Sequence, residues 1–222
     1  MDTYNDKLLT GPVRQNARIS YSKELIPMMC ELRKTERRLL EMCLAKINPI
    51  TKGEPPAGKV MFSIKEIKEG YRKGIKIEKI KEALDNLKYL KHNGKRILYR
   101  CYMTEDDKYV IMDLHYDAKR LFFDLKNYMS YHFWEVKDLT GKAYSLFVRL
   151  KKKTINKNRK ICISKQEIID ILSLCPNIEL YDLNRVVARV IKCINGSTNM
   201  KIESWGRYRK HSNVSEFIIE YK

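Results

Sequence analysis

One order of patterns occurs twice along the 222 residues, and it limits the folds open to this chain more than any other feature. In each half, an amphipathic helix pattern is followed by a short apolar strand, two further helices and two strands joined by a polar turn. The halves are residues 16–116 and 139–222. This order is typical of a winged helix, a helix-turn-helix with an added β-hairpin. We therefore predict an α+β fold of two tandem winged-helix domains.

The first set is built on regular spacing of apolar residues. A helix pattern with apolar residues at three- and four-residue steps ends before Asn48-Pro49, and a proline- and glycine-rich loop separates it from the next strand. A turn with Gly70 and Gly74 separates the next two helices. The expected elements are helix 35–47, strand 60–64, helices 64–71 and 76–91, and strands 95–103 and 108–116.

The second set repeats this order. We expect a helix over residues 140–150, a basic loop over 151–160 and a short strand, and Ser164 with Glu167 forms a capping box that opens the next helix. A longer helix ends at Asn195-Gly196. Two strands around the polar stretch GRYRKHSN complete the second hairpin.

Two segments lie outside these sets. Residues 1–15 are polar without periodicity, and we expect a flexible N-terminal arm. Residues 117–138 are apolar and aromatic, and we interpret them as a bridging segment, helical or extended, that packs the two halves together.

The charge balance makes nucleic acid the leading partner. The chain carries 45 lysines and arginines against 27 aspartates and glutamates, a net charge of +18. The excess is larger in residues 139–222, with 17 basic against 7 acidic side chains. Such a field attracts polyanions, although ribosome binding and an anionic membrane surface also suit it. We expect the main nucleic-acid contact in the C-terminal half.

Other composition features indicate a cytoplasmic protein. We find no signal peptide at the N-terminus and no apolar run of the about 20 residues that a membrane helix needs. The six cysteines lie far apart without a C-x-x-C pair, which fits neither a disulfide framework nor a zinc finger. We interpret them as reduced core residues.

The helix over residues 182–195 gives the sharpest functional prediction. Its apolar residues form a complete stripe: Leu183, Val186, Val187, Val190, Ile191 and Ile194. The opposite stripe contains Asn184, Arg185, Ala188, Arg189 and Lys192. The small Ala188 between two arginines would let the helix backbone approach base edges while the guanidinium groups reach guanine or phosphate. A solvated basic face is the plainer alternative, but the place as second helix of a helix-turn-helix favours a recognition helix.

Two further basic segments accompany this helix. The last hairpin carries Arg207, Tyr208, Arg209 and Lys210 at its tip, where a wing could follow the DNA backbone or enter the minor groove. The expected loop at residues 151–160 has six basic residues among ten, including Lys151, Lys152 and Lys153. These side chains could neutralise phosphates without reading sequence, although solvated turns are common.

The corresponding helix in the first half has charges of both signs. Lys76 and Lys79, preceded by Arg72 and Lys73, are candidate DNA contacts. Acidic neighbours on the same helix repel phosphate, and we expect this unit to bind DNA less tightly or to serve protein contacts.

Catalysis finds little support in the sequence, and we expect no enzyme, no catalytic residues, no metal and no cofactor. There is no G-x-x-x-x-G-K-[ST] phosphate loop and no His-x-His pair. His115 with Asp113 and Asp117 leaves a metal site open, although surface polar residues of a hairpin explain this cluster more simply.

Several of these segments together resemble the iteron-binding plasmid replication initiators, the Rep family with two winged helices. The segments are VRQNARI, LRKTERRLLEMCLAKI, FSIKEIKEGY, KIEKIKEALDNL, LTGKAYSLFVRLKKK, ICISKQEIIDIL and the helix that ends in KCIN. The resemblance spans nearly the whole chain. The resemblance rests on the order and spacing of these segments, because each motif alone is degenerate.

The resemblance implies binding to direct repeats at a plasmid origin, opening of nearby DNA and recruitment of host replication initiator and helicase proteins. It also implies a homodimer, formed through the first winged helix, that represses its own promoter. Arg185, Arg189 and Lys192 inherit a major-groove role, and Lys76 and Lys79 inherit it in the first unit. Two alternatives stay open: a winged-helix transcription regulator without replication activity, and a DNA-nicking or recombining enzyme.

Overall fold

The computed structural model describes residues 8–14, 16–47, 58–69, 74–123, 127–153, 160–210 and 213–221. The chain divides into two compact units, Met1–Lys137 and Asp138–Lys222, which we call unit 1 and unit 2. Each contains one complete set of winged-helix elements, in the order expected from the sequence.

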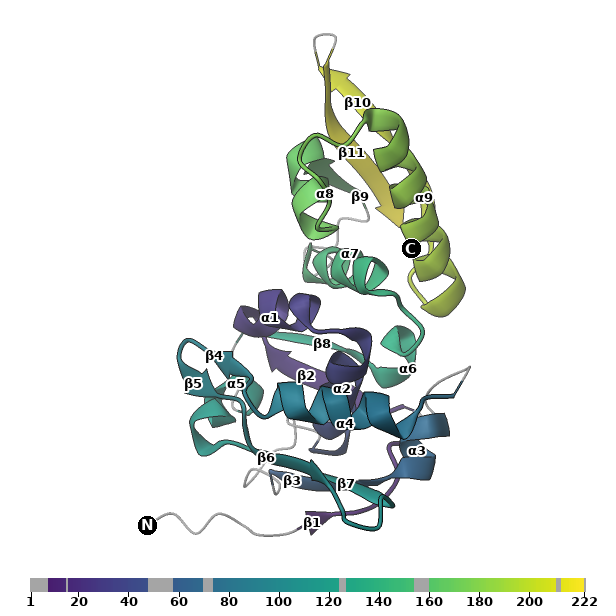
Figure 1. Cartoon of the computed structure of the whole chain (residues 1–222). Coiled ribbons are helices and arrows are strands. Elements are labelled where there is room, and N and C mark those ends of the chain that lie inside the picture. The colour runs from purple at the N-terminus through teal and green to yellow at the C-terminus, as the bar shows by residue number, and fades with distance from the viewer. Residues whose placement is uncertain are drawn as a thin grey trace. The chain divides into compact units, whose positions relative to one another are not determined.

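Unit 1 builds its winged helix around one sheet. The elements are α2 (Lys34–Ile47), β3 (Lys59–Ser63), α3 (Ile64–Glu69), α4 (Ile77–Leu87), β6 (Leu98–Met103) and β7 (Tyr109–Leu114). The strand order is β1-β3-β7-β6, and β7 is antiparallel to both of its neighbours. Figure 1 shows α2 and α4 on the same side of this sheet. Alternate strand residues, such as Val60 and Phe62 of β3, are fully buried beneath them.

Part of the expected flexible arm, residues 1–15, joins this sheet, while residues 1–7 and 15 lie outside the described residues. β1 (Leu8–Leu9) pairs in parallel with Lys59 and Val60 of β3. The backbone N–H of Val13 donates to Glu66 Oε1 at 2.8 Å. Backbone pairing with a sheet edge holds this segment although its side chains show no apolar periodicity.

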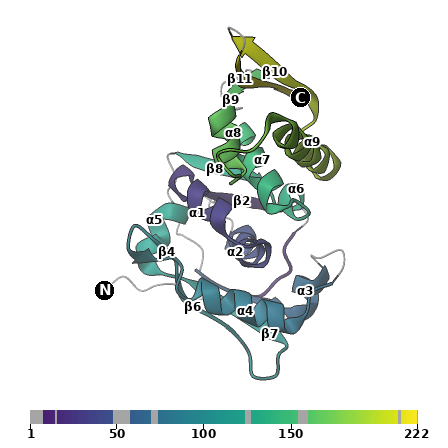
Figure 2. The same cartoon turned by 45° about the horizontal axis from the view of Figure 1, so that its top comes forward.

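A second, two-stranded sheet also lies in unit 1, and it contains part of the expected bridging segment, residues 117–138. β8 (Tyr128–His132) pairs antiparallel with β2 (Arg18–Ser22), as Figure 2 shows. The pairing makes β8 a structural strand of unit 1. The remaining short helices are η1 (Lys23–Leu25), α1 (Ile26–Glu31), η2 (Tyr116–Ala118), α5 (Lys119–Phe122) and α6 (Phe133–Val136).

Helix α2 packs against elements of both sheets, and its burial follows from that position. It contacts β2, β3 and α4. Even its charged residues Arg37 and Glu41 are buried. The Arg37 Nε atom lies 4.0 Å from Glu41 Oε1, and the Tyr131 hydroxyl donates to the same carboxylate oxygen at 3.1 Å. The opposite charge of Arg37 and the hydrogen bond from Tyr131 offset part of the cost of burying the Glu41 carboxylate.

A small hairpin precedes β6 and was not expected from the sequence. β4 (Lys91–His92) and β5 (Lys95–Arg96) pair around Asn93-Gly94, where both residues have positive φ, 49° and 76°. Asn-Gly suits a two-residue turn because asparagine tolerates and glycine readily adopts this left-handed region.

Unit 2 repeats the arrangement. Its elements are α7 (Gly141–Lys153), β9 (Lys160–Ser164), α8 (Lys165–Ile171), α9 (Leu180–Ser197), β10 (Ile202–Lys210) and β11 (Asn213–Tyr221). The strand order β10-β11-β9 matches β6-β7-β3 of unit 1. The expected basic loop over residues 151–160 is corrected at its start: Lys151, Lys152 and Lys153 form the end of α7, and residues 154–159 lie outside the described residues. Lysine is a good helix former, and cations are favourable at a helix C-terminus.

The N-cap of α8 provides a stability test in unit 2. Ser164 Oγ accepts a hydrogen bond from the Glu167 N–H at 3.0 Å, which satisfies one of the free donors of the first turn. Ser164→Ala should destabilise unit 2 by about 1 kcal/mol. Urea denaturation monitored by Trp205 fluorescence, in a Trp134→Phe background, would measure it. Ser145→Ala in α7 is the control, and an equal loss of stability in both variants would contradict the capping role.

The cysteines are all free, and their positions correct the expectation of core residues in part. Cys43 and Cys101 are buried, Cys30 and Cys193 are intermediate, and Cys162 and Cys175 are exposed. Burial raises the pKa of the Cys101 thiol to about 11. Cys162 is exposed because it alternates with the buried Ile161 and Ile163 along β9.

Candidate nucleic-acid interface

Helix α9 separates an apolar face from a cationic one. Leu183, Val187, Val190, Ile191 and Ile194 are buried. Arg185, Ala188, Arg189 and Lys192 are exposed, and their spacing places them on one side of the helix. The predicted opposition of the two stripes is therefore present, with Val186 half-buried at the edge. The helix extends two residues past Asn195, to Ser197, a difference of the size that is usual at helix ends.

Arg185 is held by two neighbours in the first turn of α9. Its Nη1 atom lies 3.8 Å from Asp182 Oδ1, and its guanidinium carbon lies 5.8 Å from the centre of the Tyr181 ring. Arg189 and Lys192 make no ion pair within the described residues of unit 2. Their charges are thus available to phosphate or base edges, whereas Arg185 must exchange its contact with Asp182.

Asn184 differs from the other members of the predicted face. It is half-buried, and its Oδ1 atom is buried without a hydrogen-bond partner among the described residues. It lies where the cationic face meets the apolar face, so that only part of its amide can reach a ligand.

The predicted wing is present as backbone. β10 and β11 pair from Ile202 with Tyr221 to Lys210 with Asn213. Figure 1 shows this hairpin lying along α9 within unit 2. The side chains of Arg207, Tyr208, Arg209, Lys210 and Lys153 lie outside the described part of the structure. Lys152 is exposed, and Lys151 Nζ lies 5.5 Å from the centre of the Phe147 ring.

In unit 1 the cations of α4 are largely paired with carboxylates. Lys79 Nζ donates to Glu82 Oε2 at 3.1 Å, and Arg33 reaches Glu82 Oε1 at 2.7 Å. Lys88 Nζ donates to Asp85 Oδ1 at 2.7 Å. Lys76 is the exposed N-cap residue rather than a member of the helix face, while Arg72 and Lys73 lie outside the described residues. The mixed charges predicted for this helix thus largely neutralise one another.

Glu82 offers a direct test of this neutralisation. The hydrogen bond from Lys79, with Arg33 nearby, lowers the pKa of Glu82, so the pairing persists at neutral pH and is lost only as pH falls through that lowered value. Glu82→Gln frees Lys79 and leaves Arg33 with Glu36 as its nearby carboxylate, and it should strengthen binding to random-sequence duplex. The dependence of log K on log salt should steepen by about one unit for each cation that reaches a phosphate. Unchanged affinity and slope, equal to those of the control Glu24→Gln, would show that α4 lies away from DNA.

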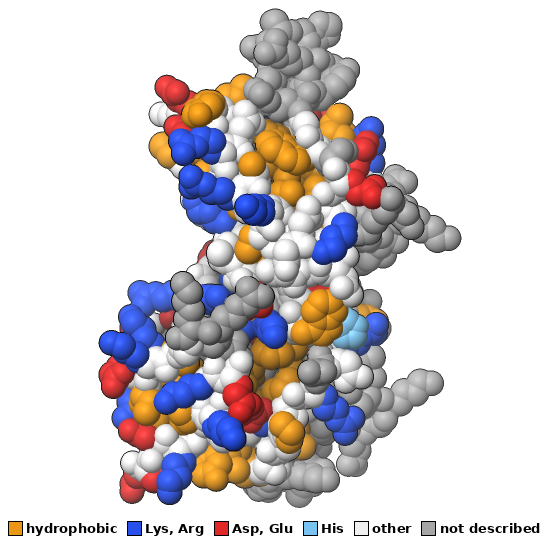
Figure 3. Space-filling view, turned by 90° about the vertical axis from the view of Figure 1, so that its right-hand side faces the viewer, with side chains coloured by type: hydrophobic (Ala, Val, Ile, Leu, Met, Phe, Trp, Pro, Cys, Tyr) orange, Lys and Arg blue, Asp and Glu red, His pale blue; other side chains and the backbone are white. Residues whose placement is uncertain are grey.

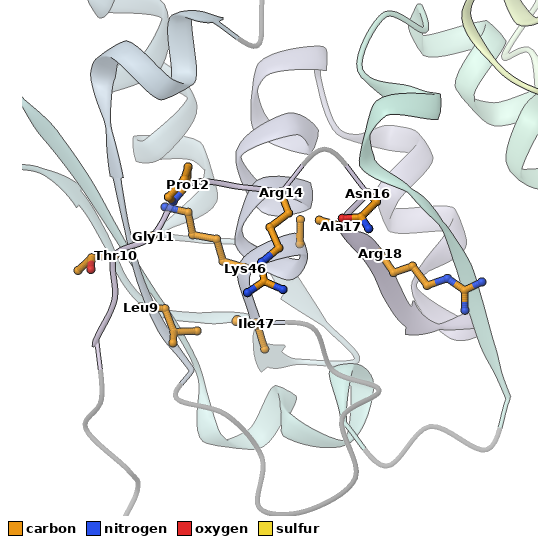
Figure 4. Close-up of a pocket in the computed structure, with 11 residues that line it drawn as sticks. Leu9, Thr10, Gly11, Pro12, Arg14, Asn16, Ala17, Arg18, Lys46 and Ile47 are labelled. Atoms are coloured by element: carbon orange, nitrogen blue, oxygen red, sulfur yellow. The ribbon is translucent and has the colours of Figure 1, made fainter.

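A recess of about 580 Å³ in unit 1 was not predicted from the sequence. It lies between the segment that follows β1 and the end of α2, and Figure 4 shows Arg14, Lys46 and Ile47 around it. The Lys46 ammonium is engaged by the Met61 carbonyl at 2.6 Å and by Glu66 Oε2 at 3.2 Å. Burial lowers the pKa of Lys46, and the Glu66 carboxylate opposes that shift. Lys46 therefore connects α2 to β3 and α3 rather than offering a charge to a ligand.

His115, Asp113 and Asp117, which were considered as a possible metal site, do not form a group that could hold a metal ion. The Asp117 N–H donates to His115 Nδ1 at 3.2 Å, and Asp117 Oδ2 lies 3.6 Å from the same nitrogen. Among the residues that the structure describes, no group of three His, Cys, Asp or Glu side chains could hold a metal ion.

The surface chemistry agrees with the charge balance. Figure 3 shows lysine and arginine side chains spread over the visible face of both units, with fewer carboxylates between them. Within the described ranges, no helix has the length and apolar character needed to cross a bilayer.

The fold defines a protein of two winged helices, and α9 of the second one has an exposed cationic face. Residues 18–150 match the family model of the initiator replication protein, WH1 domain. The chain belongs to this family of replication initiators, and the resemblance and fold class predicted from the sequence are confirmed.

A solved structure of another protein supports the fold. A crystal structure of the Pi initiator protein in complex with iteron DNA is similar to this chain, with a TM-score of 0.75 and 15% identity, covering 94% of this chain and 98% of that one. Domains 2 and 3 of RctB give a TM-score of 0.46 and 11% identity over 98% and 95% of the two chains. Comparison with curated protein sequences gives no significant match.

Proposed function

We propose that this initiator binds the direct repeats of a plasmid origin, called iterons, as duplex DNA, and starts replication there. The observation that carries the proposal is the exposed face of Arg185, Ala188, Arg189 and Lys192 on α9, opposite a buried apolar stripe. The similar Pi initiator protein is in complex with iteron DNA, which supports the same ligand for this chain.

In this proposal α9 enters the major groove and the β10–β11 hairpin is the wing. Arg189 and Lys192 reach base edges or phosphates, and Arg185 joins them on leaving Asp182. Asn184 contributes through the exposed part of its side chain. The wing residues Arg207, Tyr208, Arg209 and Lys210, and Lys151, Lys152 and Lys153 of α7, contact the backbone without reading bases. In unit 1 Arg72, Lys73, Lys76 and Lys79 make the weaker contacts, because their helix is partly neutralised.

Replacement of one reading residue and one backbone residue should separate the two roles. Arg189→Ala should weaken binding to the repeats by about 1–3 kcal/mol and relax the preference at one base position. Lys152→Ala should weaken binding to all duplexes alike and reduce the salt slope by about one. Fluorescence anisotropy on repeat and scrambled duplexes at several salt concentrations measures both. Equal losses on both duplexes for both variants would contradict the assignment.

Initiation itself needs a cellular test. A plasmid that carries the direct repeats but no initiator gene should replicate only in cells that express the chain. We expect recruitment of host initiator and helicase proteins, in the cytoplasm, and promoter repression by a homodimer formed through unit 1. Binding to the repeats without plasmid maintenance would favour a regulator instead.

The protein is proposed to act by binding and not by cutting DNA. Supercoiled plasmid carrying the repeats should stay uncut when the chain and Mg²⁺ or Mn²⁺ are added. Nicking that disappears in a His115→Ala variant would overturn this part of the proposal.

A further inference from the structure

Unit 1 contains a long stretch without carboxylates. Residues 86–104 include five lysines and arginines, three tyrosines and no aspartate or glutamate. This stretch covers the end of α4, the β4–β5 hairpin and β6. It differs from the β6–β7 turn, where Glu105, Asp106 and Asp107 follow one another. None of the DNA contacts proposed above lies in residues 86–104.

Strand β6 is at the edge of its sheet. It is last in the order β1-β3-β7-β6, and β7 is its partner on one side. In the part of the chain that the structure describes, no strand pairs with the other side of β6. An edge of this kind presents backbone N–H and C=O groups to another extended segment.

The exposed side chains of β6 are aromatic and cationic. Tyr99 is 57% exposed and Tyr102 is 38% exposed. The guanidinium carbon of Arg100 lies 4.8 Å from the centre of the Tyr99 ring, which in turn lies 6.1 Å from the His115 ring. Tyrosine and arginine are the residues that most often anchor protein interfaces.

The β4–β5 hairpin adds charge directly before this edge. Lys91, Lys95 and Arg96 are exposed, and they form no ion pair among the described residues. Figure 1 shows the hairpin at the side of unit 1, close to α5. Its position next to β6 also follows from the backbone bond of Ile97 N–H to Leu90 O at 3.0 Å.

We propose that the edge of β6 binds an extended acidic segment of a partner protein as an added strand. The segment's backbone pairs with β6, and its carboxylates meet Arg100, Lys95 and Arg96. A second copy of this chain is disfavoured, because the same cations would face each other. Nucleic acid could use the cations and rings but has no peptide groups to pair with a strand edge.

The test uses the full chain and a fluorescein-labelled heptapeptide of alternating glutamate and valine. Three probes are compared with it by anisotropy at low salt: the lysine–valine peptide, the glutamate–valine peptide N-methylated on alternate residues, and an oligothymidylate of equal charge. We expect the acidic peptide to bind at least about tenfold more tightly than the lysine peptide. N-methylation along one edge of the acidic peptide should lower its affinity by the same factor. Hydrogen exchange of the backbone amides in residues 98–103 should slow when the acidic peptide binds.

Charge reversal locates the site. Arg96→Glu with Arg100→Glu should lower acidic-peptide affinity by at least about tenfold, whereas the matched pair Lys65→Glu with Lys68→Glu on α3 should not. If the double variant unfolds at a lower temperature than the wild-type chain, the affinity of the single variant Lys95→Glu for the acidic peptide provides a second test. Four results would each overturn the proposal. The first two are equal binding of both peptides and no effect of N-methylation. The other two are tighter binding of oligothymidylate that is lost in the same variants, and self-association of the chain that is lost in those variants. DNA reading by α9 is tested separately, so either proposal can fail alone.

Discussion

Replacement of Ala188 by glutamate should abolish sequence-specific duplex binding while unit 2 stays folded. Ala188 is exposed between Arg185 and Arg189, on the face that is proposed to enter the groove. A carboxylate there would be brought against phosphates and acceptor-rich base edges. Such like-charge contact costs on the order of several kcal/mol, a loss of more than about a hundredfold in affinity. Glutamate is a good helix former, so the helix itself should persist.

The control for this variant changes the charge equally at another place in unit 2. Asn199→Glu lies in the exposed turn after α9 and should lower affinity only slightly, through the weaker overall field. Anisotropy with a duplex of direct repeats measures both variants, and circular dichroism checks the fold. If Ala188→Glu binds the repeats as well as Asn199→Glu does, the exposed face of α9 does not meet DNA.

The second large effect concerns the stability of unit 1. Glu41→Gln should destabilise this unit by about 3–5 kcal/mol, because the buried Arg37 loses the negative charge that lies 4.0 Å from its Nε atom. The two side chains are each 2% exposed. Trp134 fluorescence in a Trp205→Phe background, followed through urea denaturation, measures the loss. Trp134 lies in unit 1 and Trp205 in unit 2, so each unit can be monitored by itself.

The exposed pair in α4 provides the comparison. Glu82→Gln breaks contacts to Lys79 and Arg33 at the surface and should leave the urea midpoint of unit 1 unchanged, since solvent already screens that pair. A Glu41→Gln variant as stable as Glu82→Gln would mean that the buried carboxylate contributes nothing to unit 1.

Local periodicity was sufficient to predict the order of the winged-helix elements and the two opposite faces of α9. The stripe from Leu183 to Ile194 is visible in sequence because one side of α9 packs on the core of unit 2 and the other faces solvent. The cap by Ser164 could also be predicted from the sequence, because its hydrogen bond joins residues only three positions apart. Such features depend on neighbours along the chain.

Features that depend on distant residues could not be predicted. β2 pairs with β8 across more than a hundred residues, as Ile19 with Tyr131, and no local pattern encodes that partner. The burial of Arg37 on α2 follows from packing against elements of two sheets, which the pattern of one helix cannot show. The link from Arg33 to Glu82 is likewise tertiary.

Some missed features did have a local signal. Asn93-Gly94 is a turn dipeptide, and it could have indicated the β4–β5 hairpin. Tyr181 and Asp182 precede Arg185 by one helical turn, the spacing at which side chains of a helix meet. The i,i+3 spacing of Lys79 and Glu82 similarly anticipates their pairing.

Selection of bound fragments from random DNA, carried out in parallel with the wild-type chain and Arg189→Ala, tests the central claim most directly. The account predicts a wild-type motif in which one base position loses its preference in the variant while the other positions keep theirs. Identical motifs from the two proteins would contradict it, because Arg189 would then not read a base.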